Sequence, residues 1–526
     1  MRRRGRGRRR TKGLADLAQQ GLGFAQSAEM TAEAEGGGGR FLDDDPRQLF
    51  IGGERVDRYL MERGQELAVK LRALLEELDF SRLEAAYDRR GRRPISPRSM
   101  VGLIAYGMLN QQWSLRSLEG LARRDVGAWW VCGGHQPDHS TIGDFIQRHG
   151  ERLSGGFFVE VTRQLAKRMN LGPGVTAADG TVIEAAASRY GALRAEAAAL
   201  VAEKAREEAA RDPEDWRKQQ CAEAAKVVAE VARERTDKRI ANRGPGSGGA
   251  VAVAPSDPEA FVQPRKDGAR RPSYKPSAMV HEEGLIVAQS VHPMSEMAVI
   301  ESLIDQHQEV MGGLPARLLL DAGYHSGTLL RDLAEREIDV LCARGKADDE
   351  RQRVAREGQF GRRQFRYDAE SDSYACPAGE RLVFRQTGVD RGRPFRRYRN
   401  EGACARCELR AQCTNNPQGR YISRYEGEEY KEAMAAVLQQ PAARAVYLRR
   451  GAIAERPFAE LRERQGLRRF HRRGRAGARL EVSLHCLAFN LKWAIGRGEV
   501  ALALVVAVRC GARSQLLVLG ILHVPA

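Results

Sequence analysis

Three acidic residues, far apart in the chain, stand where the sequence predicts elements able to hold metal ions. Asp179 follows a short apolar run, and Asp321 follows the apolar run 318–320 directly. Glu455 begins a helix-like segment that leads into an arginine-rich stretch. Mg²⁺ and Mn²⁺ prefer carboxylate oxygens, and two such ions about 3.5–4 Å apart activate both the attacking and the leaving oxygen of a phosphodiester. Each acid taken alone would be interpreted as a solvated turn residue or a helix cap. The three together predict a two-metal nuclease site.

The elements around these acids are predicted to alternate between strand and helix. The pattern indicates strands at 175–179 and 181–183, a hairpin of 277–280 with 285–291, a helix at 297–311, a strand at 318–321, a helix at 327–337 and a strand at 338–343. This order is typical of a mixed α/β sheet. Neighbouring strand ends would place Asp179 beside Asp321, and an overlying helix would bring Glu455 to them.

Further segments flank or interrupt the predicted sheet, and composition separates them. Residues 45–170 read as an all-α N-terminal domain, since Leu67, Leu71 and Leu74 recur at helical spacing. The stretch 191–256 is rich in Ala, Glu, Arg and Lys and predicts a helical insertion followed by a loop. The stretch 346–425 is a second, cysteine-rich insertion. Residues 1–40 are expected to be a disordered basic tail, and 497–526 an atypical apolar tail.

The overall charge narrows the class of partner. A net charge of +17 and a pI near 9.7 favour a polyanion, most commonly nucleic acid. The alternative is that the basic N-terminal tail inflates the total. The N-terminus lacks the apolar core of a signal peptide, and the apolar run 500–508 is too short to cross a bilayer. We therefore expect a soluble cytoplasmic protein with no membrane partner.

Four of the nine cysteines form a cluster, which comprises Cys376, Cys404, Cys407 and Cys413. In a reducing compartment such a cluster indicates metal binding more than disulfides. Four thiolates are the number that a closed structural Zn²⁺ site takes. The sequence predicts structural zinc in a zinc-ribbon-like insertion, with unligated thiols in a loop as the alternative.

Several segments, in the right order, carry a resemblance to a known family. Asp179 to Ser188, Asp321 to Tyr324, Glu455 to Phe458 and Leu487 to Leu491 resemble the segments around the catalytic acids and the closing helix of DDE transposases of bacterial insertion sequences. The branch it resembles has a helical N-terminal domain and a cysteine-bearing insertion, and the resemblance covers roughly residues 45–495. It implies a ribonuclease H-like catalytic domain formed by 171–345 and 426–496, with Asp179, Asp321 and Glu455 holding Mg²⁺ or Mn²⁺.

The resemblance also implies an activity and its partners. Metal-activated water would hydrolyse the ends of an insertion sequence, and the freed 3′-hydroxyl would attack target DNA. The partners would be double-stranded DNA, as terminal inverted repeats and as target, and a second copy of the chain, giving at least a dimer in a nucleoid-associated state. Six arginines would contact phosphates, namely Arg450, Arg462, Arg468, Arg469, Arg472 and Arg473. Independently of the resemblance, segments 117–122 and 141–148 could form a helix-turn-helix that reads the element's ends, with a dimerisation or packing role as the alternative.

One motif departs from the family's pattern. Related transposases carry a Tyr, Arg, Glu, Lys series around the last acid. Here Tyr447, Arg450 and Glu455 nearly match, with one extra residue before the glutamate, and Arg462 stands where lysine is expected. A guanidinium also clamps phosphate. An inactive or domesticated transposase descendant that binds DNA without cutting it is the alternative function, and a zinc-dependent DNA-binding regulator would leave the carboxylates unexplained.

Overall fold

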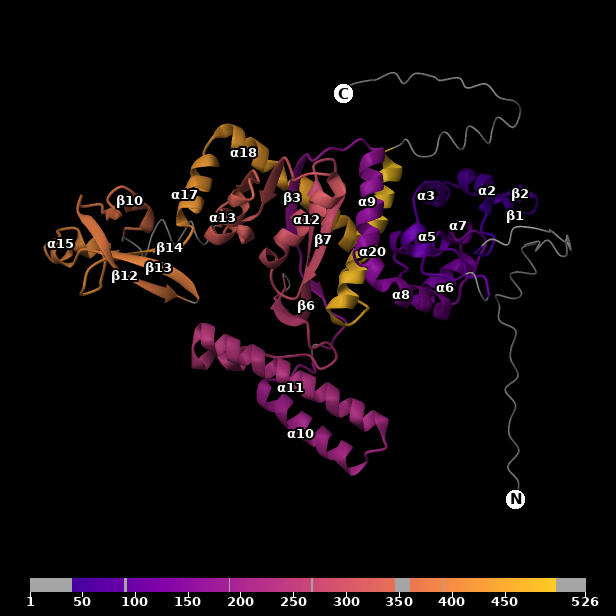
Figure 1. The fold of residues 1–526 in the computed structure, drawn as a ribbon, viewed down its shortest axis with the longest axis horizontal. Helices are drawn as coiled ribbons and strands as arrows, with labels where there is room; N and C mark the ends of the chain where they lie inside the picture. The colour runs from indigo at the N-terminus through magenta and orange to yellow at the C-terminus, as the bar shows by residue number, and fades with distance from the viewer. Residues whose placement is uncertain are drawn as a thin grey trace. The chain divides into compact units, whose positions relative to one another are not determined.

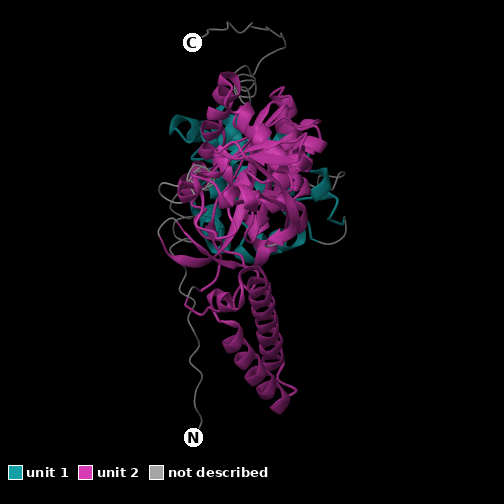
Figure 2. Ribbon diagram, turned by 90° about the vertical axis from the view of Figure 1, so that its left-hand side faces the viewer, with its two compact units in different colours: residues 1–150, 487–526 teal, residues 151–486 magenta. Residues whose placement is uncertain are grey.

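The chain divides into two units, which Figure 2 shows in separate colours. Residues 1–150 with 487–526 form the first, and residues 151–486 form the second. The computed structural model describes residues 40–88, 92–188, 190–265, 268–345, 360–390 and 392–497. The two predicted tails, 1–40 and 497–526, lie outside the described residues except for Arg40 and Arg497.

The first unit is mainly helical, and its helices begin where the sequence places N-cap residues. The Ser96 and Ser114 hydroxyls accept the backbone N–H groups of Ser99 and Ser117 at the starts of α5 and α6. The leucines predicted to share one face are largely buried in α3. The helices are α2 (Val56–Glu62), α3 (Glu66–Glu77), α4 (Ser81–Glu84), α5 (Pro97–Leu109), α6 (Leu115–Arg124), α7 (Val126–Val131) and α8 (His139–Leu153).

The prediction that this unit is all-α was wrong, because it also holds a small β-hairpin. Strands β1 (Phe50–Ile51) and β2 (Glu54–Arg55) pair antiparallel. The intervening Gly52 and Gly53 have φ of 54° and 89°, and two successive positive φ values form the tight turn that right-twisted strands need. In addition, α7 lies between the two helices predicted as a helix-turn-helix, so α6 and α8 are not consecutive.

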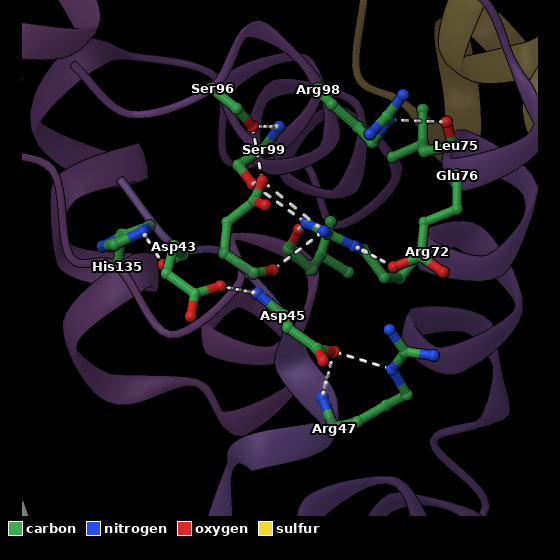
Figure 3. A network of polar contacts seen from close by, with 12 residues as sticks. Asp43, Asp45, Arg47, Arg72, Leu75, Glu76, Ser96, Arg98, Ser99 and His135 are labelled. Carbon is green, nitrogen blue, oxygen red and sulfur yellow. Dashed lines mark hydrogen bonds and ion pairs between the residues drawn. The ribbon is translucent and has the colours of Figure 1, made fainter. Parts of the chain in front are cut away.

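A buried arginine ties this unit together (Figure 3). The guanidinium of Arg72, on α3, is buried, and it donates to the Ser99 hydroxyl, to the Val131 carbonyl and to the carboxylate of Glu76. It also pairs with Asp44 at 3.5 Å. Burial would raise the pKa of Asp44, but hydrogen bonds from Ser96 and Ser99 and the charge of Arg72 outweigh it and lower that pKa. A buried charge that is satisfied in this way fixes the helix packing.

The second unit is built on a mixed sheet in which β7, β6, β3, β8 and β9 follow one another from edge to edge. Strand β3 pairs antiparallel with β6 and parallel with β8, which in turn pairs parallel with β9. Strands β4 and β5 pair with the first half of β6. The bounds are β3 (Val175–Gly180), β4 (Ile183–Glu184), β5 (Phe261–Pro264), β6 (Arg270–His281), β7 (Ile286–His292), β8 (Arg317–Leu320) and β9 (Val340–Cys342).

The central strands are apolar because the sheet is covered. Ala177, Ala178 and the whole run 318–320 are fully buried, as expected for parallel strands between helical layers. The covering helices of this unit include α9 (Gly156–Arg168), α12 (Ile300–Met311) and α13 (Gly327–Glu335), and α12 packs against both β7 and α9 (Figure 1). The fold class is mixed α/β, as the sequence predicted.

Two further substructures interrupt the sheet order. Helices α10 (Ala195–Arg211) and α11 (Trp216–Arg243) form a hairpin with a break at Asp212 and Pro213, within the stretch predicted to be a helical insertion. Between β9 and the last helices lies a second, antiparallel sheet whose strands the sequence did not predict. It consists of β10 (Arg366–Asp368), β11 (Ser373–Ala375), β12 (Arg381–Asp390), β13 (Arg393–Arg399) and β14 (Tyr421–Tyr425).

The last described elements are helical. They are α17 (Glu428–Val437), α18 (Pro441–Leu448), α19 (Arg450–Ala459), a π-helical turn at Glu460–Arg464 and α20 (Gly474–Gly496). Helix α19 packs against β3 and β6. Of the helices in the described ranges, none is both long enough and apolar enough to pass through a bilayer.

Candidate metal centre

Three carboxylates meet at one edge of the central sheet. One ligand oxygen from each of Asp179, Glu296 and Asp321 lies within 4.8 Å of the others. Among the described residues, this is the sole group in which three metal-ligating side chains come so close together. The two aspartates that the sequence predicted to be neighbours are therefore brought together, and Glu296 joins them.

Strand register explains how the two aspartates meet. Ala178 of β3 stands opposite Leu320 of β8 in the parallel pair, so the next residue in each strand is a catalytic candidate, Asp179 or Asp321. Since parallel strands end at the same edge, the carboxylates project from adjacent strand ends. The backbone then orients them: the Gly180 N–H donates to Asp179 Oδ1 at 2.8 Å, and the Gly323 N–H donates to Asp321 Oδ1 at 2.8 Å.

A glycine makes room for the third carboxylate. A Cβ atom at Gly180 would lie 2.6 Å from Cγ of Glu296, closer than such atoms approach. Glu296 itself follows β7 and precedes the 3₁₀ turn Met297–Val299. It reaches the aspartates because β7 pairs with β6 and β6 pairs with β3. Only a strand end without a side chain at position 180 accommodates this approach.

Cationic side chains partly offset the negative charge of the group. Lys275 Nζ lies 2.6 Å from Glu296 Oε1, and Arg450 Nη1 lies 3.8 Å from Asp179 Oδ2. Burial nevertheless raises the pKa of Asp179, and the charges of Asp321 and Glu296 raise it further against the Gly180 N–H and Arg450. A divalent cation bound here would offset both the desolvation of Asp179 and its repulsion by the neighbouring carboxylates.

A buried tyrosine lies against the same group. Tyr324 is fully buried, and its pKa is raised well above the ordinary value by burial and by the charges of Glu296, Asp321 and Asp179. Its phenol therefore stays protonated. Tyr324 is therefore a neutral, buried neighbour of the three carboxylates.

Glu455 lies outside this group of three. It occupies α19 and its side chain is exposed, with Oε1 3.5 Å from where a Cβ atom of Gly451 would lie. The first residue of the same helix, Arg450, is the one that contacts Asp179. The helix predicted to overlie the strand ends does so, and the role of Glu455 remains a prediction.

The six arginines predicted to contact phosphates have different environments. The side chain of Arg450 is 16% exposed and turned toward Asp179, and Arg462 is half-buried in the π-helical turn. Arg468, Arg469 and Arg473 are exposed, while Arg472 is half-buried. Arg468 pairs with Glu463 and Arg469 lies 3.9 Å from Glu184. Exposed arginines on one short segment suit phosphate contact.

A buried glutamate holds this arginine-rich segment in place. The carboxylate of Glu481, on α20, accepts the backbone N–H groups of His471 and Arg472. Burial raises the pKa of Glu481 to about 7, although those N–H groups and the charge of Arg472 lower it. The same burial lowers the pKa of the Arg472 guanidinium. Glu481 thus positions the segment 468–473 through its backbone. No local pattern in the sequence pointed to Glu481.

The four clustered cysteines line one cavity beside the five-stranded sheet. Cys376 begins a tight turn in which the Gly379 N–H donates to the Cys376 carbonyl at 2.9 Å, with Gly379 at φ +82°. Burial raises the pKa of Cys413; Arg420 lowers it, and Cys404, Cys376 and Cys407 raise it further. The sulfur atoms of these described cysteines do not meet the close spacing of the acidic group.

Two family models match the chain. A transposase domain matches residues 58–148, which span α2 to α8 of the first unit. The transposase DDE domain matches residues 375–494, which contain the four cysteines, Glu455 and the arginine-rich segment. Together the matches indicate a DDE transposase of the insertion-sequence type. A comparison with curated proteins gave no significant match.

The range matched by the DDE domain and the acidic group contain different parts of the candidate site. Residues 375–494 include Glu455 but neither Asp179 nor Asp321. The structure places α19 from the matched range against β3 from the unmatched range. The geometry therefore connects the DDE match to the two aspartates.

The like charges of the acidic group predict a stability effect. The pKa of Asp179 in the folded chain lies above its ordinary value of 3.8, so its ionisation costs folding free energy at every pH above that range. Asp179→Asn should therefore raise the melting temperature of the metal-free protein at pH 7 by about 2–4 °C. Millimolar Mn²⁺ should raise the melting temperature of the wild type and leave the variant unchanged. Thermal unfolding with and without EDTA measures both effects.

The matched control is Asp237→Asn, which changes an exposed aspartate on α11. It should alter neither the melting temperature nor its response to Mn²⁺. A melting temperature for Asp179→Asn that is below the wild-type value without metal would contradict the account of the site's electrostatics.

Proposed function

We propose that the chain is a DNA transposase that cleaves the ends of an insertion sequence and joins them to target DNA. The observation that carries the proposal is the convergence of Asp179, Asp321 and Glu296 at one strand edge, in a chain with transposase-domain matches. The strand order β7-β6-β3-β8-β9, with two antiparallel pairs followed by two parallel pairs, supports a ribonuclease H-like catalytic domain.

The donor set fits a hard divalent cation. Three carboxylates with side chains partly open to solvent offer the oxygen ligands that Mg²⁺ or Mn²⁺ prefers, and leave room for water and phosphate oxygens. When bound, such ions supply an activated water or hydroxyl and stabilise the leaving oxygen. We assign Asp179 and Asp321 as the principal ligands, with Glu455 as the third acid implied by the family pattern and Glu296 as an added ligand.

The remaining residues orient the site and its substrate. Gly180 and Gly323 hold the two aspartates through their N–H groups. Lys275 and Arg450 hold Glu296 and Asp179 before metal binds, and Arg450 would turn to a phosphate once cations occupy the site. Arg462, Arg468, Arg469, Arg472 and Arg473 would track the backbone of the duplex. Because two element ends react together, the active form would be at least a dimer, located with the nucleoid in the cytoplasm.

One observation favours the alternative of a descendant that binds DNA without cutting it. Glu455 is exposed and lies outside the acidic group, and Arg450 is the residue of the same helix that lies next to Asp179. In that case the acidic group would bind cations weakly and the arginines alone would hold DNA.

A nicking assay separates the two functions. With Mn²⁺ and a labelled duplex carrying an element end, the wild type should nick at the end. Asp179→Asn and Asp321→Asn should each lower the rate by more than about 100-fold, since removing a direct ligand should exceed the 10–100-fold cost of removing a residue behind one. Glu455→Gln should have a similar effect. Glu296→Gln should raise the Mn²⁺ concentration needed for half-maximal rate and keep the maximal rate within about tenfold.

Binding of the same duplex in EDTA is the control for each variant, and it should be unchanged. Binding without metal-dependent nicking by the wild type would establish the alternative function. Wild-type nicking by Glu455→Gln, with loss in Glu296→Gln, would assign the third acid to Glu296.

The cysteine cavity supports a separate proposal, a structural Zn²⁺ ion held by Cys376, Cys404, Cys407 and Cys413. Four thiols that face one cavity match the donor set of a closed zinc site. The cavity adjoins the buried cluster of Phe365, Tyr374, Leu382, Tyr398 and Ile422, against which Cys376, Cys404 and Cys413 pack. A metal there would hold the five-stranded sheet together.

Metal analysis of the purified protein should find about one zinc per chain. Cys407→Ser should lose the zinc and lower the melting temperature, because binding free energy of structural zinc is folding free energy. The control Cys221→Ser changes an exposed cysteine on α11 and should keep the full zinc content. Equal zinc contents in the two variants would contradict this assignment.

A further inference from the structure

The five-stranded sheet has one packed face and one open face. Leu382, Tyr398 and Ile422 point into the buried cluster. Since side chains alternate along a strand, the residues one step away lie on the other side. Six of them form what we call the open face, Arg393, Phe395, Arg397, Arg399, Tyr421 and Tyr425. The register joins them, with Phe395 opposite Tyr425 and Arg399 opposite Tyr421.

Arginines on the open face stack on aromatic rings. The Arg397 guanidinium lies 4.8 Å from the Phe395 ring centroid and 4.6 Å from that of Tyr421. Arg393 lies 4.7 Å from the Tyr425 ring centroid. Stacking of this kind fixes the plane of a guanidinium and leaves the N–H groups at its edges available.

These two stacked arginines have no carboxylate partner among the ion pairs found in the described ranges. Arg399, by contrast, pairs with Glu401. Arg396, on the packed side, pairs with Asp372. Asp390 stands opposite Arg393 in the strand register, and its carboxylate accepts the Tyr425 hydroxyl at 3.0 Å. The fixed donors of Arg393 and Arg397 are therefore left for an external anion.

The charge of the whole hairpin points to a polyanion. Strands β12 and β13 together contain six arginines and a single acidic residue, Asp390. Arg393 is exposed, Arg397 is half-buried, and the Tyr421 ring beside Arg397 is 44% exposed, so solvent reaches part of this surface. None of the residues assigned to the metal centre or to the segment 468–473 lies on these strands.

We propose that the open face binds duplex DNA through its phosphates, as a second contact site apart from the acidic group. It rests on the proposed function only in taking DNA as the partner. Guanidinium groups held flat on rings bind phosphate oxygens bidentately, and a two-stranded β-ribbon fits the major groove of a duplex. Backbone contacts of this kind anchor DNA without reading its sequence.

The test compares two double variants of the full chain on a duplex of arbitrary sequence in EDTA. Arg393→Gln with Arg397→Gln removes the two stacked charges. Arg206→Gln with Arg233→Gln removes two exposed charges from the α10–α11 hairpin. Fluorescence anisotropy at graded salt should show weaker binding for the first variant. Its plot of log K against log salt should be shallower by about 2, since each lost phosphate contact removes roughly 0.9. The control should match the wild type.

A variant that keeps both charges and a measurement on the wild type show whether a loss of binding comes from misfolding of the Gln variant. Arg393→Lys with Arg397→Lys should keep the wild-type salt slope. In the wild type, duplex DNA should protect Arg393 and Arg397, but not Arg206 and Arg233, from modification by phenylglyoxal, read by mass spectrometry. Unchanged affinity and slope in the Gln variant, or no protection in the wild type, would overturn the proposal and leave the face to a protein partner. A chain that binds duplex here but never nicks it would refute only the catalytic proposal.

Discussion

The candidate metal centre of the second unit depends on holding three carboxylates together at one edge of a sheet. Asp179, Glu296 and Asp321 repel one another at this spacing, and burial of Asp179 adds to the cost. Lys275 and Arg450 offset part of it. Proteins store such unfavourable charge where a ligand relieves it. A divalent cation is the ligand that this donor set favours, which is why the site and the transposase matches support the same function.

The backbone maintains this arrangement. The parallel pairing of β3 and β8 sets the two aspartates side by side, and the missing side chain of Gly180 admits Glu296. Outside the sheet, single buried charged residues likewise hold neighbouring segments in position. Glu481 fixes the arginine-rich segment through two backbone N–H groups, and Arg72 joins three helices of the first unit. In each case backbone groups or an opposite charge compensate the cost of burying the charge. The buried group therefore fixes the position of its neighbours and does not destabilise the fold.

The sequence predicted the central strands and both aspartates, because a buried apolar run followed by an acid is a local signal. It missed Glu296, whose approach depends on the pairing of β6 with both β7 and β3, and no local pattern records that pairing. It missed the strands β10 to β14 because arginines occupy positions where alternating apolar residues were sought, as in β13. The distance of Glu455 from the acidic group is set by the docking of α19, which the sequence does not encode locally.

Crystals of the protein soaked in Mn²⁺ test the central claim most directly, because manganese is located by its anomalous scattering. The account predicts a peak within coordination distance of the carboxylates of Asp179 and Asp321, absent from crystals of the Asp179→Asn variant. Manganese bound elsewhere, with nothing between these two aspartates at saturating concentration, would contradict it.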